Sequence, residues 1–177
     1  MTTRRRFLQI GLAGAAALLA VDALERAFTV AGRGLGGTLA ADDLRVARAL
    51  APVVLAGALP SGAPEREAAL GRIVAGFARV VARLGPAERR QLTRLLGLLR
   101  WPPARLLLAG LWRPLEEAQE RDIAVFLQRW RASPFDLLRA AYAALTQLLQ
   151  AACYDDPESW ARIGYPGPPV LDGGPVR

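Results

Sequence analysis

Apolar residues recur at helical spacing through most of the chain from Asp42 onward. Between residues 64 and 84 they fall at every third or fourth position, which places them on one face of a helix. Pro64 and Glu65 are typical of a helix start, and Gly85 is typical of a stop. The predicted buried stripe of this helix is Leu70, Ile73, Val74, Phe77, Val81 and Leu84.

Two helices flank this one in the predicted order. The first is capped by Asp42 or Asp43 and ends or kinks at Pro52. The second begins at Pro86 and is broken by Trp101-Pro102-Pro103. Residues 106–112 are nearly all apolar, which indicates either a short helix buried on several sides or one that faces a partner.

Two long helices are predicted beyond residue 112. Pro114 begins one of them, with glutamates early and arginines late, which suits the helix macrodipole. The residues from Ser133 to Asp136 have the spacing of a capping box for the other. No stretch alternates apolar and polar residues with period two. We therefore expect an all-α protein, an irregular bundle of about five or six helices. The four other long helices also have predicted buried stripes. In chain order these are Leu44, Ala47, Ala51, Val54 and Leu55 before the helix of 64–84, and, after it, Leu92, Leu95, Leu96 and Leu99; Ile123, Phe126, Leu127 and Trp130; and Leu138, Ala141, Tyr142, Leu145, Leu149 and Ala152.

The N-terminus resembles a twin-arginine export signal. Thr3, Arg4, Arg5, Phe7 and Leu8 match the pattern S/T-R-R-x-F-L-K, with glutamine in place of the final lysine. The apolar run from Phe7 to Val21 is about 22 Å long as a helix and short of the roughly 30 Å hydrocarbon core. That length favours a signal segment over a permanent span, and an ordinary secretory signal or a retained membrane anchor is the alternative.

Composition removes several classes of chemistry. The chain of 177 residues is 53% hydrophobic and 7% aromatic, and it contains no histidine. The commonest general base, the usual haem ligand and most zinc sites are therefore excluded. Cys153 is the single cysteine and lies on an apolar helical stretch, where a buried small residue is expected. The net charge is +7, but the arginines are scattered among acids, so no nucleic-acid partner is predicted.

The C-terminal stretch differs in composition from the rest of the chain. Asp156 is placed to cap a short helix with Pro157 at its first position, and Gly164 ends it. The proline-rich residues beyond favour an extended conformation. Aromatic residues such as Trp160 and Tyr165 are good anchors for a partner, and the alternative is that this tail packs on its own bundle. We divide the chain into a signal and glycine-rich linker (1–40), a helical domain (41–153), and a short helix with a tail (154–177).

The chain resembles the gluconate 2-dehydrogenase subunit 3 family in three features. These are a leader of this kind, a helix with the run 47–51 leading to Leu59-Pro60, and a tail of the form D-P-x-S-W-x-x-I-G-Y-P-G-P. The tail carries the most specific part of the resemblance. Its matching residues are Asp156, Pro157, Ser159, Trp160, Ile163, Gly164, Tyr165, Pro166, Gly167 and Pro168.

The resemblance implies a small, non-catalytic subunit of a large flavin dehydrogenase of the glucose–methanol–choline type. Such a subunit carries the export address for its partner, and electrons then pass to a cytochrome c subunit or another acceptor. FAD is expected in the partner and no cofactor in this chain, which lacks a G-x-G-x-x-G motif after a strand. We expect a periplasmic location, with attachment to the inner membrane if the leader is retained.

Recognition residues follow from this reading. Arg4, Arg5, Phe7 and Leu8 would address the translocase. Those expected to bind the partner are Asp156, Pro157, Trp160, Ile163, Gly164, Tyr165 and Pro166. The alternatives are a membrane-anchored helical scaffold and an independent small enzyme. The enzyme would have to use carboxylates such as Glu116, Glu117, Glu120 and Asp122.

Overall fold

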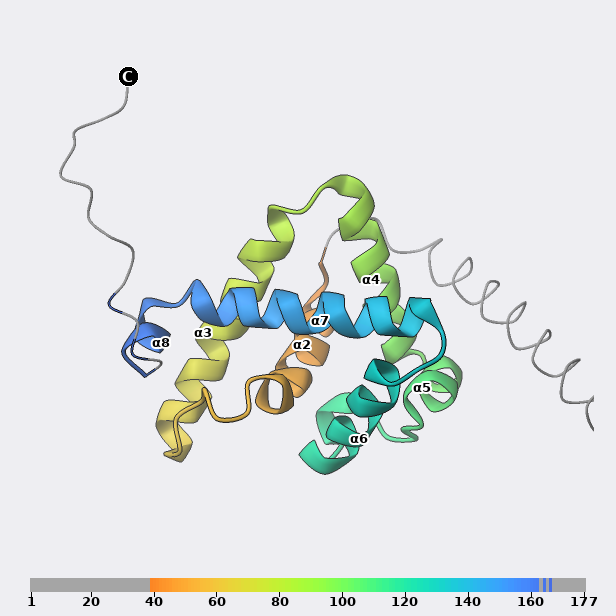
Figure 1. The fold of residues 1–177 in the computed structure, drawn as a ribbon, viewed down its shortest axis with the longest axis horizontal. Helices are drawn as coiled ribbons and strands as arrows, with labels where there is room; N and C mark the ends of the chain where they lie inside the picture. Colours follow the sequence, from red (N-terminus) through yellow and green to blue (C-terminus); the bar gives the residue numbers. More distant parts are fainter. Residues whose placement is uncertain (1–38, 163, 165, 167–177) are drawn as a thin grey trace, which may run out of the picture. The chain divides into compact units, whose positions relative to one another are not determined.

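A computed structural model describes residues 39–162, 164 and 166 of the chain (Figure 1). The regular structure of these residues is helical throughout, which confirms the all-α fold class. Five helices of the described part have twelve residues or more, and two, α5 and α8, are short. The elements are α2 (Ala41–Val54), α3 (Ala63–Ala82), α4 (Pro86–Arg100), α5 (Pro102–Ala109), the 3-10 helix η1 (Leu115–Glu117), α6 (Glu120–Arg131), α7 (Asp136–Tyr154) and α8 (Pro157–Arg162).

The chain forms two compact units. The first comprises residues 84–118 together with the start of α2 up to Val46. The second comprises residues 47–83 and the chain from Gln119 onward. The boundary between the units therefore falls within α2, and each unit has buried residues of its own.

In the second unit α7 packs against α3 and α6, and α8 packs against α7 (Figure 1). Gly76 allows the close approach of α3 to α7, because a Cβ atom there would lie only 2.9 Å from the carbonyl oxygen of Ala152. The rings of Phe126 and Trp130 meet edge to face with centroids 4.8 Å apart. The largest fully buried side chains of this unit are Leu50, Ile73, Phe77, Ile123, Phe126, Trp130, Leu145 and Leu149.

In the first unit α4 and α5 pack together around Leu98, Ala104 and Leu108. The start of α2 is tied to the end of α4 by Arg100. Its guanidinium donates to Asp42 over 2.8 Å and to Asp43 over 3.0 Å. Asp43 is fully buried, so this pair fixes the first turn of α2 against the last residue of α4.

The predicted apolar stripes agree closely with the buried faces. All four stripe residues of α6 are buried, as are most of those on α3 and α4. Cys153 is also buried, as expected for a small residue on the inner face of α7. The exceptions are half-buried residues at stripe edges, namely Leu44, Val54, Val74, Leu84, Leu95, Leu138, Ala141 and Tyr142.

Several predicted helix boundaries were wrong for local reasons. Asp43 does not precede α2 but lies in its first turn, where its carboxylate accepts the backbone N–H of Ala40 over 2.9 Å. Pro52 lies inside α2, which continues to Val54. Gly85 does not end α3, which already ends at Ala82 with Arg83 as its C-cap. Its φ of −60° and ψ of 159° make it the extended N-cap of α4.

The starts of α6 and α7 also differ from the prediction. Pro114 precedes only the 3-10 helix η1, and α6 begins later, at Glu120. The capping box at Ser133 does not form. Its hydroxyl accepts the N–H of Phe135 over 3.1 Å, and Phe135 is the N-cap of α7. A hydroxyl bond two residues along the chain makes a turn instead of a cap.

The apolar stretch 106–112 is not buried on several sides, so that alternative is wrong. α5 ends at Ala109, and Gly110 adopts the left-handed conformation with φ of 71°. Leu106, Leu107 and Trp112 are exposed. None of the helices in the part that the structure describes has the length and apolar character needed to cross a membrane.

Candidate partner-binding site

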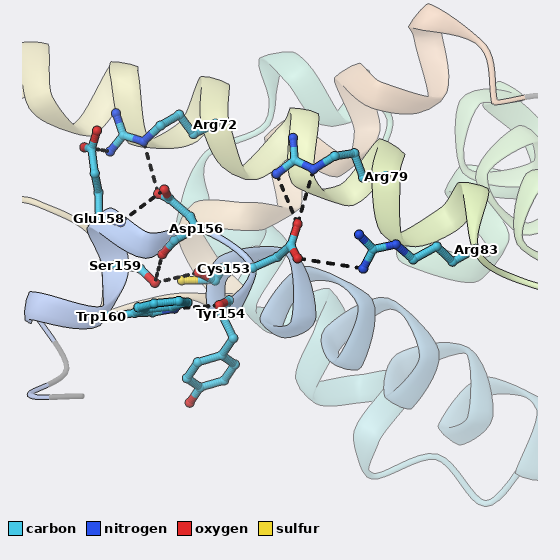
Figure 2. A network of polar contacts seen from close by, with 10 residues as sticks. Arg72, Arg79, Arg83, Cys153, Tyr154, Asp156, Glu158, Ser159 and Trp160 are labelled. Atoms are coloured by element: carbon cyan, nitrogen blue, oxygen red, sulfur yellow. Dashed lines mark hydrogen bonds and ion pairs between the residues drawn. The ribbon is translucent and has the colours of Figure 1, made fainter. Parts of the chain in front are cut away.

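The tail motif begins at a tight junction between α7 and α8. Asp155 is the C-cap of α7, and Pro157 is the first residue of α8. Asp156 lies between them and caps α8 as predicted, because its Oδ1 accepts the N–H of Glu158 over 3.3 Å. We call residues 154–160, together with Arg72 and Arg79 of α3, the α7–α8 corner (Figure 2).

Side chains of α8 satisfy backbone carbonyls at the end of α7. The Ser159 hydroxyl is buried and lies 2.6 Å from the carbonyl oxygen of Cys153 and 2.7 Å from that of Asp156. The indole Nε1 of Trp160 donates to the carbonyl oxygen of Tyr154 over 2.7 Å. The last carbonyls of a helix have no partner within the helix, so these bonds hold α8 against the end of α7.

Arg72 fixes the start of α8 to α3. Its Nε donates to Oδ2 of Asp156 over 3.1 Å, and its Nη2 lies 2.6 Å from Oε2 of Glu158. Only 6% of Asp156 is exposed, so its carboxylate oxygens depend on hydrogen bonds within the protein, and Arg72 provides one of them. Figure 2 shows Arg72 reaching down from α3 between the two carboxylates.

A second arginine of α3 binds the C-cap of α7. Arg79 donates from Nε and Nη2 to Oδ2 of Asp155, over 3.2 and 3.1 Å. Arg83 adds a longer ion pair of 3.8 Å to the same carboxylate. The corner is therefore held by charge-assisted bonds to α3 and by side-chain bonds to α7.

The outer side of the corner carries an aromatic pair. The ring of Tyr154 is 60% exposed and extends away from α3 (Figure 2). Trp160 is half-buried, and its bond to the backbone carbonyl of Tyr154 holds the indole at the end of α7. A partly exposed indole held in this way is suited to recognition, because little of its side-chain entropy remains to be lost on binding.

The structure brings together three of the seven tail residues proposed to bind a partner. Asp156, Pro157 and Trp160 lie in the corner, where Asp156 and Trp160 have internal partners that tie this segment to its own domain. Gly164 is exposed and has a φ of 70°, which suits glycine just beyond α8. Pro166 is also exposed. Residues outside the described part are Ile163 and Tyr165 of the tail and Arg4, Arg5, Phe7 and Leu8 of the leader.

Sequence reasoning missed the arginines that hold the corner and the exposed ring of Tyr154. Arg72, Arg79 and Arg83 are spaced by seven and four residues, which places them along one side of α3. That spacing is a visible signal. The partner carboxylates lie 72 or more positions away along the chain, so the pairing follows only from the packing of α3 on α7.

The acidic residues proposed for an independent enzyme lie on η1 and at the start of α6. Glu116 and Glu117 are exposed on η1, and Glu120 pairs with Arg66 of α3 over 2.6 Å. Asp122 lies 3.7 Å from Arg121. Within residues 39–162, 164 and 166, no three histidine, cysteine, aspartate or glutamate residues are placed to hold a metal ion.

Comparison of the chain with models of protein families, with curated proteins and with solved structures finds no match.

Proposed function

We propose that this chain is the small, non-catalytic subunit of a flavin-dependent sugar or alcohol dehydrogenase, and that it binds, helps to mature and exports its partner. The proposal starts from the leader and the tail motif, which resemble those of gluconate 2-dehydrogenase subunit 3 proteins. The twin-arginine route carries folded proteins, so a partner that acquires FAD in the cytoplasm could travel with this address.

The observation that carries the proposal is the α7–α8 corner. A helix of six residues is held in place by four side chains, those of Arg72, Asp156, Ser159 and Trp160. So short a helix is not stable by itself, so these contacts determine its position relative to α7 and α3. The exposed side chain of Tyr154 lies at the junction between α7 and α8.

In this proposal the chain acts by binding alone. The tail extends along the dehydrogenase, and Tyr154 and Trp160 provide the aromatic contacts near its base. The flavin chemistry belongs to the partner, and the electrons pass from there to a cytochrome c subunit or another acceptor. The charged bonds of the corner act indirectly, by presenting the aromatic pair in one orientation.

Co-purification tests the proposal directly. The full chain, tagged at its C-terminus in the native host, should retain a large yellow protein at near-equal stoichiometry. Tyr154→Ala should reduce the recovery of that protein at least about fivefold, as expected for loss of an aromatic contact worth 1 kcal/mol or more. Phe135→Ala is the matched control, because Phe135 is also an exposed aromatic residue but lies at the opposite end of α7.

A colourless, solitary chain, recovered again at low salt, would rule out the subunit proposal. Recovery of a yellow partner that is equally reduced by Phe135→Ala and by Tyr154→Ala would keep the subunit role and reject the corner as its base.

A further inference from the structure

α5 exposes apolar side chains and buries its charged one, the reverse of an ordinary surface helix. Its one charged residue, Arg105, is only 4% exposed, whereas Leu106 is 43% and Leu107 is 71% exposed. Pro103 and Gly110 are exposed at the same helical spacing as the two leucines. The solvent-facing side of α5, every residue of which is described, therefore presents no charged side chain.

The buried arginine holds the chain that follows α5. Its Nη1 donates to the carbonyl oxygen of Arg100 over 2.9 Å, and its Nη2 donates to that of Trp112 over 3.0 Å. Arg105 thus ties the loop after α5 to the end of α4. The indole of Trp112 is left 80% exposed, and Trp101 at the other end of α5 is 48% exposed. We call Trp101, Leu106, Leu107 and Trp112 the α5 face.

The start of α2, which follows the leader in the sequence, is bound to the residue that precedes this face. Asp42 and Asp43 in the first turn of α2 are bound to Arg100, and Trp101 is the next residue along the chain. Residues 22–38 connect the apolar leader run to α2 and can span at most about 60 Å. A leader held in a membrane would therefore keep the start of α2 within that distance of the bilayer, and the α5 face belongs to the same unit.

We propose that the α5 face docks on the surface of a lipid bilayer, with Leu106, Leu107 and Trp112 inserted at the boundary between headgroups and acyl chains. The inference rests on the proposed function and adds that the leader is retained as a membrane anchor, the alternative that the sequence leaves open. Leucines flanked by tryptophans are typical of segments that lie in the membrane interface. The tether raises the local concentration of bilayer, so modest insertion is sufficient.

The side chains around the face favour lipid over a protein partner. Protein interfaces surround an apolar centre with polar groups that form about one hydrogen bond per 100–200 Å². The outward side of α5 offers no such group. Arg113 next to Trp112 is exposed, but so are Glu116 and Glu117 of η1, so these charges form no basic patch that would attract anionic headgroups. Docking of the α5 face should therefore depend on apolar insertion and change little with salt.

Vesicle experiments with the full chain separate the leader from the α5 face. The vesicles contain phosphatidylcholine and phosphatidylglycerol, with or without brominated acyl chains. Co-sedimentation reports binding through either part, whereas quenching of tryptophan emission by bromine reports insertion of the rings. We expect quenching in the native chain and loss of most of it in Trp112→Phe. Trp160→Phe, which removes a half-buried indole of the other unit, should retain it.

A charge on the face provides the second variant. Leu107→Glu should abolish the quenching of Trp112 while the chain still sediments with vesicles through its leader. Leu137→Glu is the matched control, since Leu137 is a 55% exposed leucine on α7, and it should leave the quenching unchanged.

Sedimentation without quenching of Trp112 would overturn the inference and leave the leader's role intact. Tryptophan emission that is unchanged by lipid but changes when the co-purified large subunit is added would also overturn the inference. That result would identify the α5 face as a protein-docking surface. Absence of sedimentation would overturn both the inference and a membrane-inserting leader, because sedimentation reports binding through either part.

Discussion

Asp156→Ala tests whether the α7–α8 corner holds α8. The substitution removes the carboxylate that caps α8 at the N–H of Glu158 and accepts a bond from Nε of Arg72. Arg72 keeps its ion pair with Glu158, so its charge is not left without a partner. The change should therefore loosen α8 without unfolding the helices of the second unit.

The magnitude follows from the two lost interactions. Loss of an N-cap side chain costs about 1 kcal/mol. A hydrogen bond to a charged group contributes about 1.5–3 kcal/mol. We reduce the latter to about 1 kcal/mol because the Arg72 side chain is 34% exposed and its charge is partly screened by solvent. The total of about 2 kcal/mol corresponds to a roughly thirtyfold increase in opening of α8. Asp156→Asn retains a capping oxygen and should show about half of the free-energy change.

Hydrogen exchange of peptides covering residues 155–162, followed by mass spectrometry, measures this opening locally. Asp136→Ala is the matched control, because the Asp136 side chain is largely exposed and pairs only with Arg139 of its own helix. It should leave exchange in α8 unchanged. Exchange in α8 that is the same in Asp156→Ala as in the native chain would refute the reasoning. Exchange that is already unprotected in the native chain would refute it as well.

Three further predictions concern stability. Gly76→Ala should destabilise the chain by about 1–3 kcal/mol in urea unfolding, because its Cβ would meet the carbonyl of Ala152. Gly71→Ala is the control: no atom lies within 4 Å of its Cβ, so it should stabilise α3 by up to about 1 kcal/mol. The reverse order would contradict the observed approach of α3 to α7. Phe77→Ala should cost about 3–5 kcal/mol in the same assay, and a loss below 1 kcal/mol would place this fully buried ring outside the core. Arg105→Met should increase exchange of the loop after α5 by leaving two carbonyls unpaired, and unchanged exchange would show that the arginine does not hold it.

The fold could be predicted largely from the apolar periodicity. The stripes on α3, α4 and α6 identify buried faces because tertiary packing preserves the helical period. Helix ends were less predictable, since one residue type serves several local structures. Gly85 caps the start of α4 in an extended conformation, although glycine also commonly ends a helix. Ser133 makes a turn bond to Phe135, although serine also commonly caps a helix.

The candidate site was only partly predictable. The cap of Asp156 depends on residues next to it in sequence, and it was expected correctly. The bond of Arg72 to Asp156 depends on the packing of α3 against α7, which no local pattern encodes. The internal bonds of Ser159 and Trp160 show that part of the tail motif stabilises its own domain, the alternative that the sequence left open.

The central claim is that this chain exports a flavin dehydrogenase. The most direct measurement is the distribution of the co-purified large subunit between cytoplasm and periplasm in cells whose only copy of this chain carries Arg4→Lys and Arg5→Lys. The account predicts that both subunits remain in the cytoplasm and still bind each other, because the α7–α8 corner is unchanged. A dehydrogenase that reaches the periplasm with these substitutions would contradict it.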